Sequence, residues 1–244
     1  MRKITQLFVA GPPIVKFATG EDLSKEELGG TELCGSNGTI DNVVGSEQEA
    51  FLAIRKFLSF LPSHSDLLPP KSESDDSPER REEELLNIVP NKEDKRPFEV
   101  RKVIELIADK KSFFEVGDSW GNTAVVGFAR MNGHTVGIVA NNGSVMGGVL
   151  TAKSSQKIKR HVDLCSVFNV PIVLLVDTAG IAVGKTAEEE STIKFATSCL
   201  VALFNCKSPS FTVILRKVYG VGGAAMVDFA TNFRVSWPSG DWGR

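Results

Sequence analysis

The chain has 244 residues, a formal net charge of −2, and 42% hydrophobic against 24% charged residues, as expected for a globular protein of one large or two small domains. The near-neutral charge gives no electrostatic basis for binding nucleic acid or an anionic membrane, and no apolar stretch approaches the roughly 18 residues that cross a bilayer. We therefore expect neither nucleic acid nor a membrane among its partners.

The first segment, residues 1–61, is expected to contain short helices. Two capping boxes, Ser24–Glu27 and Ser46–Glu49, predict helix starts, because their side chains satisfy free amides of a first turn. The second is followed by apolar residues spaced for one buried helix face: Phe51, Ile54, Leu58 and Leu61. The basic N-terminus has only a short apolar stretch before Pro12 and Pro13, which does not fit a signal peptide.

Cysteine and histidine are sparse in this chain. The residues are Cys34, Cys165, Cys199 and Cys206, and His64, His134 and His161. No cysteines form a C-x-x-C pair, so we expect reduced core thiols in an intracellular protein, cytoplasmic or in the mitochondrial matrix. The histidines are scattered, whereas metal ligation needs clustered ligands, so no metal site is expected.

Residues 62–96 differ from the rest in composition. They are rich in proline and serine and carry the acidic tract Glu73–Asp76. A stretch of this kind buries little apolar surface, which predicts a linker. Leu85–Leu86 and Ile88–Val89 are the parts able to attach it to a neighbouring surface.

From residue 97 to the end, strand patterns alternate with helix patterns. The predicted strands are 113–116, 124–131, 134–139, 172–176, 211–215 and 234–237. Three helices are predicted in this part. The first starts at Pro97, and its buried face is Val100, Val103, Ile104 and Ile107; the second follows the loop 141–148, with Ile158, Val162, Cys165 and Phe168. The third starts at Thr186, with Ile193, Ala196, Leu200, Leu203 and Phe204. Asn132-Gly133 predicts a hairpin, because both turn positions need positive φ. The pattern indicates an α/β protein with a mixed sheet covered by helices.

The run RKVYGVGGAAM, residues 216–226, places glycines between a predicted strand and a predicted helix. A dinucleotide site is one interpretation, but the acid that it needs about 20 residues on, Asp241, follows a strand broken at Trp237-Pro238. Close packing of helix on sheet is the second. The third is an oxyanion site, because free amides at a helix start attract negative charge.

The third interpretation is favoured by a family resemblance that four parts of the sequence carry. These parts are RKVYGVGGAAM with FRVSWPSGDWG (233–243), FVAGPPIVKFATGEDLSKEELGG (8–30), EEELLNIVPNKEDKRPFEVRKVIELIADKKSFFEV (82–116) and HVDLCSVFNVPIVLLVDTAGIAVG (161–184). Together they resemble the carboxyltransferase (β-type) subunit of biotin-dependent acyl-CoA carboxylases, such as the propionyl-CoA and acetyl-CoA carboxylase β chains. They cover almost the whole chain in order.

The resemblance implies a crotonase-like (ClpP/crotonase) fold that is incomplete here. Residues 1–61 would be the tail of the N-terminal carboxyltransferase half, 62–96 the linker, and 97–244 the C-terminal half, truncated at its end. The implied reaction moves CO2 from carboxybiotin to the α-carbon of a short acyl-CoA, acetyl- or propionyl-CoA, through enolates held in backbone oxyanion holes. The implied partners are a biotin carboxylase/biotin carrier subunit and further copies, because the family forms hexamers through contacts between N-terminal and C-terminal halves.

The resemblance also assigns site residues by position. The oxyanion hole falls on the backbone N–H groups of Val221 and Gly222. The residues implied to shape the site or bind biotin and substrate are Gly220, Gly223, Asp177, Thr178, Ala179, Gly180, Gly147 and Gly148.

The sequence departs from the family pattern in two ways. Family members are roughly twice as long, so the acyl-CoA platform of the first half is missing and we expect the chain to be inactive alone. Locally, Ala179 replaces a usual proline and Cys34 a usual histidine, and neither change abolishes the implied oxyanion hole. A non-catalytic interaction module of the same fold and a nucleotide-binding oxidoreductase remain alternatives.

Overall fold

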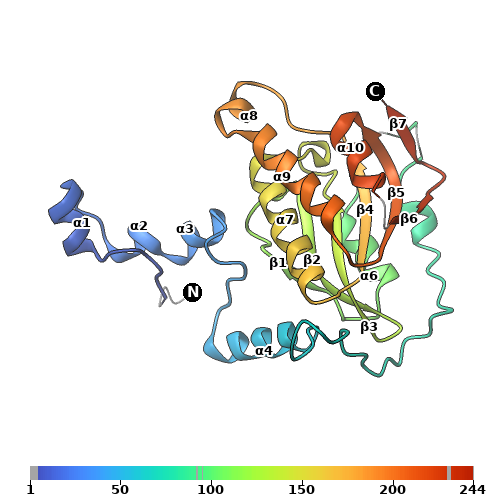
Figure 1. Ribbon diagram of the computed structural model, residues 1–244, viewed down its shortest axis with the longest axis horizontal. Coiled ribbons are helices and arrows are strands. Elements are labelled where there is room, and N and C mark those ends of the chain that lie inside the picture. Colours follow the sequence, from blue (N-terminus) through green and yellow to red (C-terminus); the bar gives the residue numbers. More distant parts are fainter. Residues whose placement is uncertain (1–4, 92, 95, 230–231, 244) are drawn as a thin grey trace.

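The computed structural model describes residues 5–91, 93–94, 96–229 and 232–243, and its centre is one mixed sheet (Figure 1). The strands are β1 (Phe114–Val116), β2 (Ala124–Met131), β3 (His134–Asn141), β4 (Ile172–Thr178), β5 (Ser210–Tyr219), β6 (Asn232–Ser236) and β7 (Asp241–Gly243). They pair in the order β1-β2-β3-β4-β5-β6, with β7 also on β5. The pairs β1–β2 and β2–β3 are antiparallel and the others parallel, which confirms the predicted mixed sheet.

The predicted hairpin is present with the predicted turn. Asn132 and Gly133 have φ of 50° and 76°, and Met131 pairs with His134 on either side of them. Strand β4 is buried along its whole length, as its continuous apolar run predicts. These two signals are local, so the sequence alone locates them.

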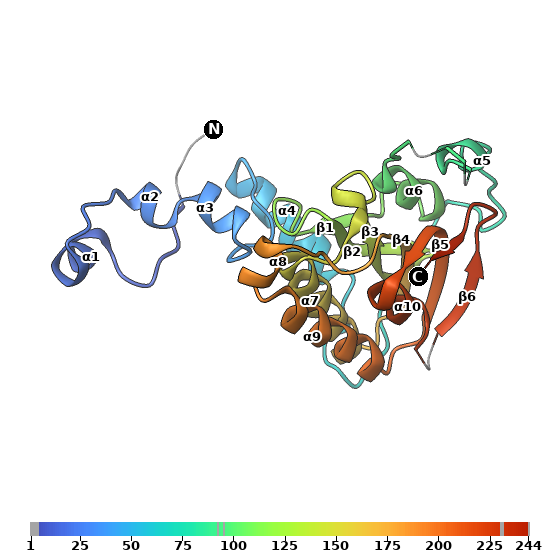
Figure 2. The same ribbon diagram turned by 90° about the horizontal axis from the view of Figure 1, so that it is seen from above.

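Helices cover both faces of the sheet (Figure 2). On one face lie α7 (Ala152–Val167), α9 (Thr192–Asn205) and α10 (Gly220–Val227); on the other lie α5 (Leu85–Ile88) and α6 (Val100–Ile107). Each face has its own apolar cluster, with Ile158, Val162 and Leu174 in the first and Val103, Ile104 and Leu175 in the second. Three of the four apolar residues expected to attach residues 62–96 do so, because Leu85 and Ile88 pack on the second cluster and Val89 is buried in it, whereas Leu86 is 75% exposed.

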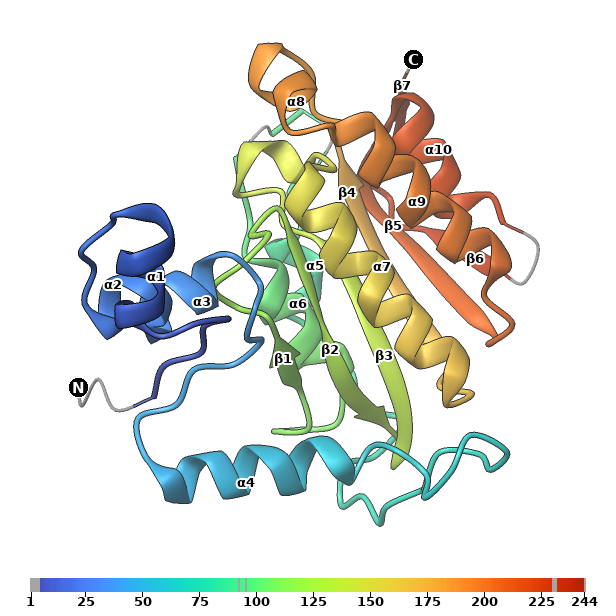
Figure 3. The same cartoon turned by 60° about the vertical axis from the view of Figure 1, so that its left-hand side comes forward.

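Helices α1 (Pro12–Thr19), α2 (Lys25–Gly29) and α3 (Thr31–Ser36) form an N-terminal arm that extends away from the sheet (Figure 3). Helix α4 (Glu47–Leu58) lies next to the sheet, and its Phe57 packs on the first apolar cluster. Polar contacts join the segment between the arm and α4 to the rest of the chain: Asn42 Nδ2 donates to the Glu115 carbonyl at 2.9 Å, and Arg160 of α7 donates to the Gly38 carbonyl at 3.2 Å and forms an ion pair with Asp41.

The prediction of which face of α4 is buried is wrong. Phe51, Ile54 and Leu58 are 54%, 54% and 58% exposed, while Leu61 is partly buried as expected. The inward contacts come instead from Phe57 and Phe60, which lie against the rings of Phe114 and Phe128. This helix has apolar residues on two sides, and spacing alone does not say which side meets the sheet.

The helix expected from Thr186 is two helices, α8 (Lys185–Glu189) and α9. Ser191 has a φ of 55°, a left-handed conformation that separates the two helices. Ala196 and Leu203 are buried and Leu200 is partly buried, as expected, but Ile193 and Phe204 are 59% and 53% exposed. Two smaller differences are that α6 begins at Val100 rather than Pro97, because Glu99 caps it, and that β7 is an unpredicted strand.

The cysteines are free and buried, as expected, and Cys165 lies 3.7 Å from the ring of His161 in the core. Burial is the main reason that the pKa of His161 is lowered from its ordinary 6.5 to about 4; a backbone hydrogen bond to Gly127 opposes the shift, and the nearby Lys157 charge adds to it. The neutral ring therefore contributes stability that is fully present above pH 6.5 and is lost as the pH falls toward 4.

We expect the substitution His161→Phe to flatten this part of the stability profile. The wild-type chain should lose roughly 3 kcal/mol more than the variant between pH 6.5 and pH 4, because only the wild type must bury a group that protonates on unfolding. Urea unfolding at several pH values measures the difference. Parallel profiles for the two proteins would contradict it, since the carboxyl groups that titrate in the same range are common to both.

Candidate functional site

Three turns meet at the carboxyl ends of β4 and β5. They are the short helix η1 (Met146–Gly148), the turn 177–180 that follows β4, and the junction 219–223 between β5 and α10. The first two turns are joined because Ala179 N donates to the Gly147 carbonyl at 3.1 Å. The second and third lie in contact, since a Cβ on Gly180 would come 3.0 Å from the Tyr219 carbonyl oxygen. The structure thus brings together the residues that the sequence assigned to one site.

The third turn presents free backbone amides. Val221 and Gly222 lie in the first turn of α10, where N–H groups have no acceptor within the helix. In the described part of the chain, neither amide donates to a backbone or side-chain acceptor outside the helix. Val221 is 75% exposed, so an oxygen of a ligand can approach from solvent. The positive end of the helix dipole favours a negative charge there.

Each glycine of this junction has a separate structural reason. Gly220 has φ of 60°, a conformation that side-chain-bearing residues adopt with strain. A Cβ on Gly222 would lie 2.8 Å from Ile181 Cγ1, and one on Gly223 would lie 2.9 Å from the Val218 carbonyl carbon. Close helix–sheet packing therefore explains Gly222 and Gly223, and this packing also orients the free amides.

The first turn is equally constrained. Gly147 and Gly148 have φ of 68° and 70°, and a Cβ on Gly148 would lie 2.4 Å from the Asp177 carbonyl oxygen. In the second turn, Gly180 N donates to Thr178 Oγ1 at 3.1 Å. Gly180 also accepts from Leu150 N at 2.8 Å. These bonds fix the backbone that surrounds the free amides.

The Asp177 carboxylate is fully buried and faces protein groups rather than solvent. Arg216 donates to it from Nε at 3.3 Å and from Nη2 at 3.0 Å, and Lys217 N donates at 3.0 Å. Asp177 is thus an anchor between β4 and β5, and not a general base. The sequence analysis did not assign Arg216 and Lys217 to the site. The signal for them was the pair of cations at the start of the run RKVYGVGGAAM.

Tyr219, the residue before the glycines, is hydrogen-bonded to the neighbouring strand β7. Its hydroxyl donates to Asp241 Oδ2 at 2.6 Å, across the pairing of β5 with β7. This hydrogen bond, with partial burial and the charge of Asp241, raises the pKa of Tyr219. Asp241 is therefore engaged by the protein, which removes the acid that a dinucleotide site would use for a ribose.

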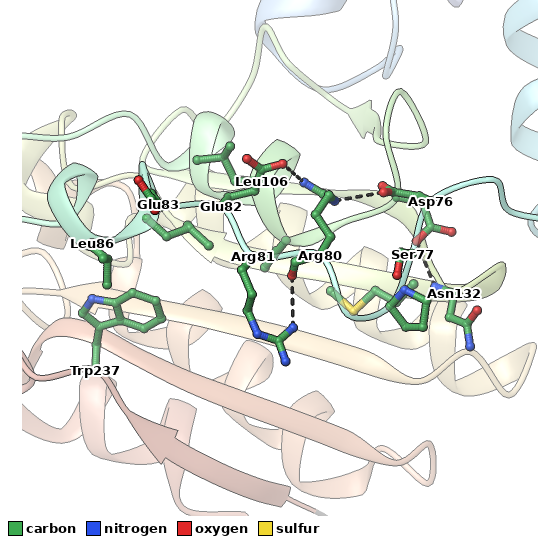
Figure 4. Close-up of a pocket in the computed structure, with 15 residues that line it drawn as sticks. Asp76, Ser77, Arg80, Arg81, Glu82, Glu83, Leu86, Leu106, Asn132 and Trp237 are labelled. Atoms are coloured by element: carbon green, nitrogen blue, oxygen red, sulfur yellow. Dashed lines mark hydrogen bonds and ion pairs between the residues drawn. The ribbon is translucent and has the colours of Figure 1, made fainter.

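A cavity of about 620 Å³ lies elsewhere, between residues 76–86, α6 and Trp237 (Figure 4). Its arginines have acidic partners nearby, because Arg80 Nε lies 3.0 Å from Asp76 Oδ1 and Arg81 Nη2 lies 3.2 Å from Glu79 Oε2. The site at the three turns is distinct from this cavity. Within the described residues there is also no group of three potential metal ligands and no helix able to cross a membrane.

The helix-covered mixed sheet, with a site built from backbone turns, defines a crotonase-like carboxyltransferase fold. The transcarboxylase 12S crystal structure, a hexamer with methylmalonyl-coenzyme A bound, superposes with a TM-score of 0.93 at 36% identity over 99% of this chain and 46% of that one. Residues 1–239 match the carboxyl transferase domain family. The chain belongs to this family.

Two named relatives show the extent of the match. The chain is 34% identical to the propionyl-CoA carboxylase carboxyltransferase subunit of Haloferax mediterranei, over 99% of this chain and 47% of that protein. It is 37% identical to the methylmalonyl-CoA carboxyltransferase 12S subunit of Propionibacterium freudenreichii subsp. shermanii, over 99% of this chain and 46% of that protein. The chain thus spans about half the length of these relatives.

Proposed function

We propose that the chain is the C-terminal carboxyltransferase part of a biotin-dependent acyl-CoA carboxylase, with residues 1–61 as the tail of the N-terminal half and 62–96 as the linker. The whole enzyme would move CO2 from carboxybiotin to the α-carbon of acetyl- or propionyl-CoA. The observation that carries the proposal is the pair of free amides at Val221 and Gly222, in a fold whose relatives are carboxyltransferases.

In this proposal, biotin on a carrier partner supplies the carboxyl group when it is bound. The chain's own part is to bind an oxygen that gains negative charge, and donors fixed in advance lose no energy in reorienting toward it. Gly222 is buried, with Ile181 against the position that a Cβ would take, so the oxygen would approach from the exposed side at Val221. The site residues fit a ureido or enolate oxygen, because they offer N–H donors and a helix start but no buried free carboxylate.

We expect the purified chain to show no carboxyl transfer alone, because the other half of the site would come from an N-terminal half outside its length. Free biotin, methylmalonyl-CoA and the chain are incubated, and loss of methylmalonyl-CoA is measured, with the Propionibacterium freudenreichii 12S subunit as the positive control. Turnover by the isolated chain would contradict this expectation. Transfer that appears on adding a biotin carrier and an N-terminal carboxyltransferase half would support the proposed function.

An interaction module of the same fold is the second candidate, favoured by the half-length match. In that case the chain would co-purify with a biotinylated carrier, and no assembly would turn over.

A further inference from the structure

The charges around Asp177 do not balance. Arg216, itself only 6% exposed, contacts both carboxylate oxygens of Asp177 and so compensates its charge. Lys217 adds a second cation to the same group, with Nζ 3.7 Å from Asp177 Oδ1. One buried carboxylate therefore has two cationic partners, which leaves a surplus positive charge at Lys217.

The ammonium group of Lys217 is loosely held. Nζ donates to the Gly147 carbonyl at 3.4 Å, and Asp177 is its only ion-pair partner among the described residues. An ammonium group carries three N–H donors, and both of these contacts are long. Another acid, Asp241, is paired with Lys217 in the β5–β7 register, and it accepts a hydrogen bond from the Tyr219 hydroxyl.

Lys217 is also open to solvent at the site. Its side chain is 21% exposed, whereas those of its neighbours Asp177 and Arg216 are 0% and 8% exposed. Nζ lies against the Gly147 turn, where the carbonyl that it contacts also accepts from Ala179 N. Ala179 belongs to the turn 177–180, whose Gly180 packs against Gly222, the second residue with a free amide.

We propose that Lys217 binds a small carboxylate-type anion at this site, which under the proposed function is the carboxyl group being transferred. The inference rests on the proposed function for the identity of the anion, but not for the anion site itself. A partly buried cation forms charge-assisted hydrogen bonds to carboxylate oxygens. Two long contacts, to Asp177 and to the Gly147 carbonyl, keep Nζ near the site, and the Lys217 charge stays available to an anion because Arg216 compensates Asp177.

The test uses bicarbonate as the probe, at constant ionic strength against chloride, with amide NMR shifts of Gly147, Gly148 and Gly180 as the readout. The wild-type chain should show a saturable shift in the millimolar range, and Lys217→Met should bind about tenfold more weakly. Lys217→Arg should restore binding to within roughly threefold, because the charge returns. The matched control is Lys207→Met, an exposed lysine before the opposite end of β5, which should titrate as the wild type.

Equal bicarbonate binding by the wild type and Lys217→Met would overturn the inference, as would the absence of any saturable shift in a wild-type chain whose spectrum is that of a folded protein. Retained binding in Lys217→Arg shows that charge, and not a disturbed fold, is responsible. The titration needs no turnover. If bicarbonate binding depends on Lys217 but no assembly transfers a carboxyl group, the proposed function fails and the anion site stands.

Discussion

Replacing Val221 with proline is expected to lower kcat for carboxyl transfer about 10²–10³-fold, because it removes one of two donors to the developing oxyanion. Proline has no N–H, yet it is accepted in the first turn of a helix, where that N–H has no intrahelical acceptor. Val221 lies in that turn, and its side chain is 75% exposed. The substitution therefore removes the donor and little else.

The control for this substitution is Val221→Ala, which shortens the same exposed side chain but keeps the amide. It should leave kcat within about twofold, since surface truncations away from packed groups have small effects. Both variants are assayed in an assembly that supports transfer by the wild type, and thermal unfolding confirms that each is folded. A proline variant with the wild-type kcat would show that the Val221 amide does not contact the reacting oxygen.

Local chemistry explains how much of the fold was predictable. The hairpin at Asn132-Gly133, strand β4 and the buried stripe of α7 each depend on residues close together in the chain. Turn conformation and apolar period determine them directly. The resemblance to carboxyltransferase subunits then supplied the fold class, whereas the order in which distant strands pair is seen only in the structure.

The errors arose where a choice depends on the rest of the molecule. Helix α4 has apolar residues on two sides, and only contact with the Phe114 and Phe128 rings decides that Phe57 faces inward. The break at Ser191 is a backbone conformation that no glycine or proline marks. Such features follow from tertiary packing, so they are absent from the spacing of residues along the chain.

The same reasoning applies to the site. The glycines and the turn 177–180 were located by motif, but the motif does not show that Asp177 is buried beneath the turn with Arg216 and Lys217 around it. A carboxylate next to a site is often taken as a catalytic base. Here its hydrogen bonds assign it to the support of the backbone turns.

Asp177→Asn should therefore be the most destabilising polar substitution at this site, with a loss of about 3–5 kcal/mol in the free energy of unfolding. Asparagine has nearly the same shape and can still accept from Lys217 N. It leaves Arg216, which is 6% exposed, without its counter-charge. Chemical denaturation of the isolated chain measures the loss, and no assay of activity is needed.

A matched control separates burial from simple loss of an ion pair. Asp163 pairs with Lys159 on α7, where the two side chains are 49% and 43% exposed, so Asp163→Asn should cost less than about 1 kcal/mol. The double substitution Asp177→Asn with Arg216→Met should recover part of the loss, because no unpaired charge remains buried. If Asp177→Asn cost no more than Asp163→Asn, the anchor between β4 and β5 would lie elsewhere. The free amides of Val221 and Gly222 would then be positioned by the glycine packing alone.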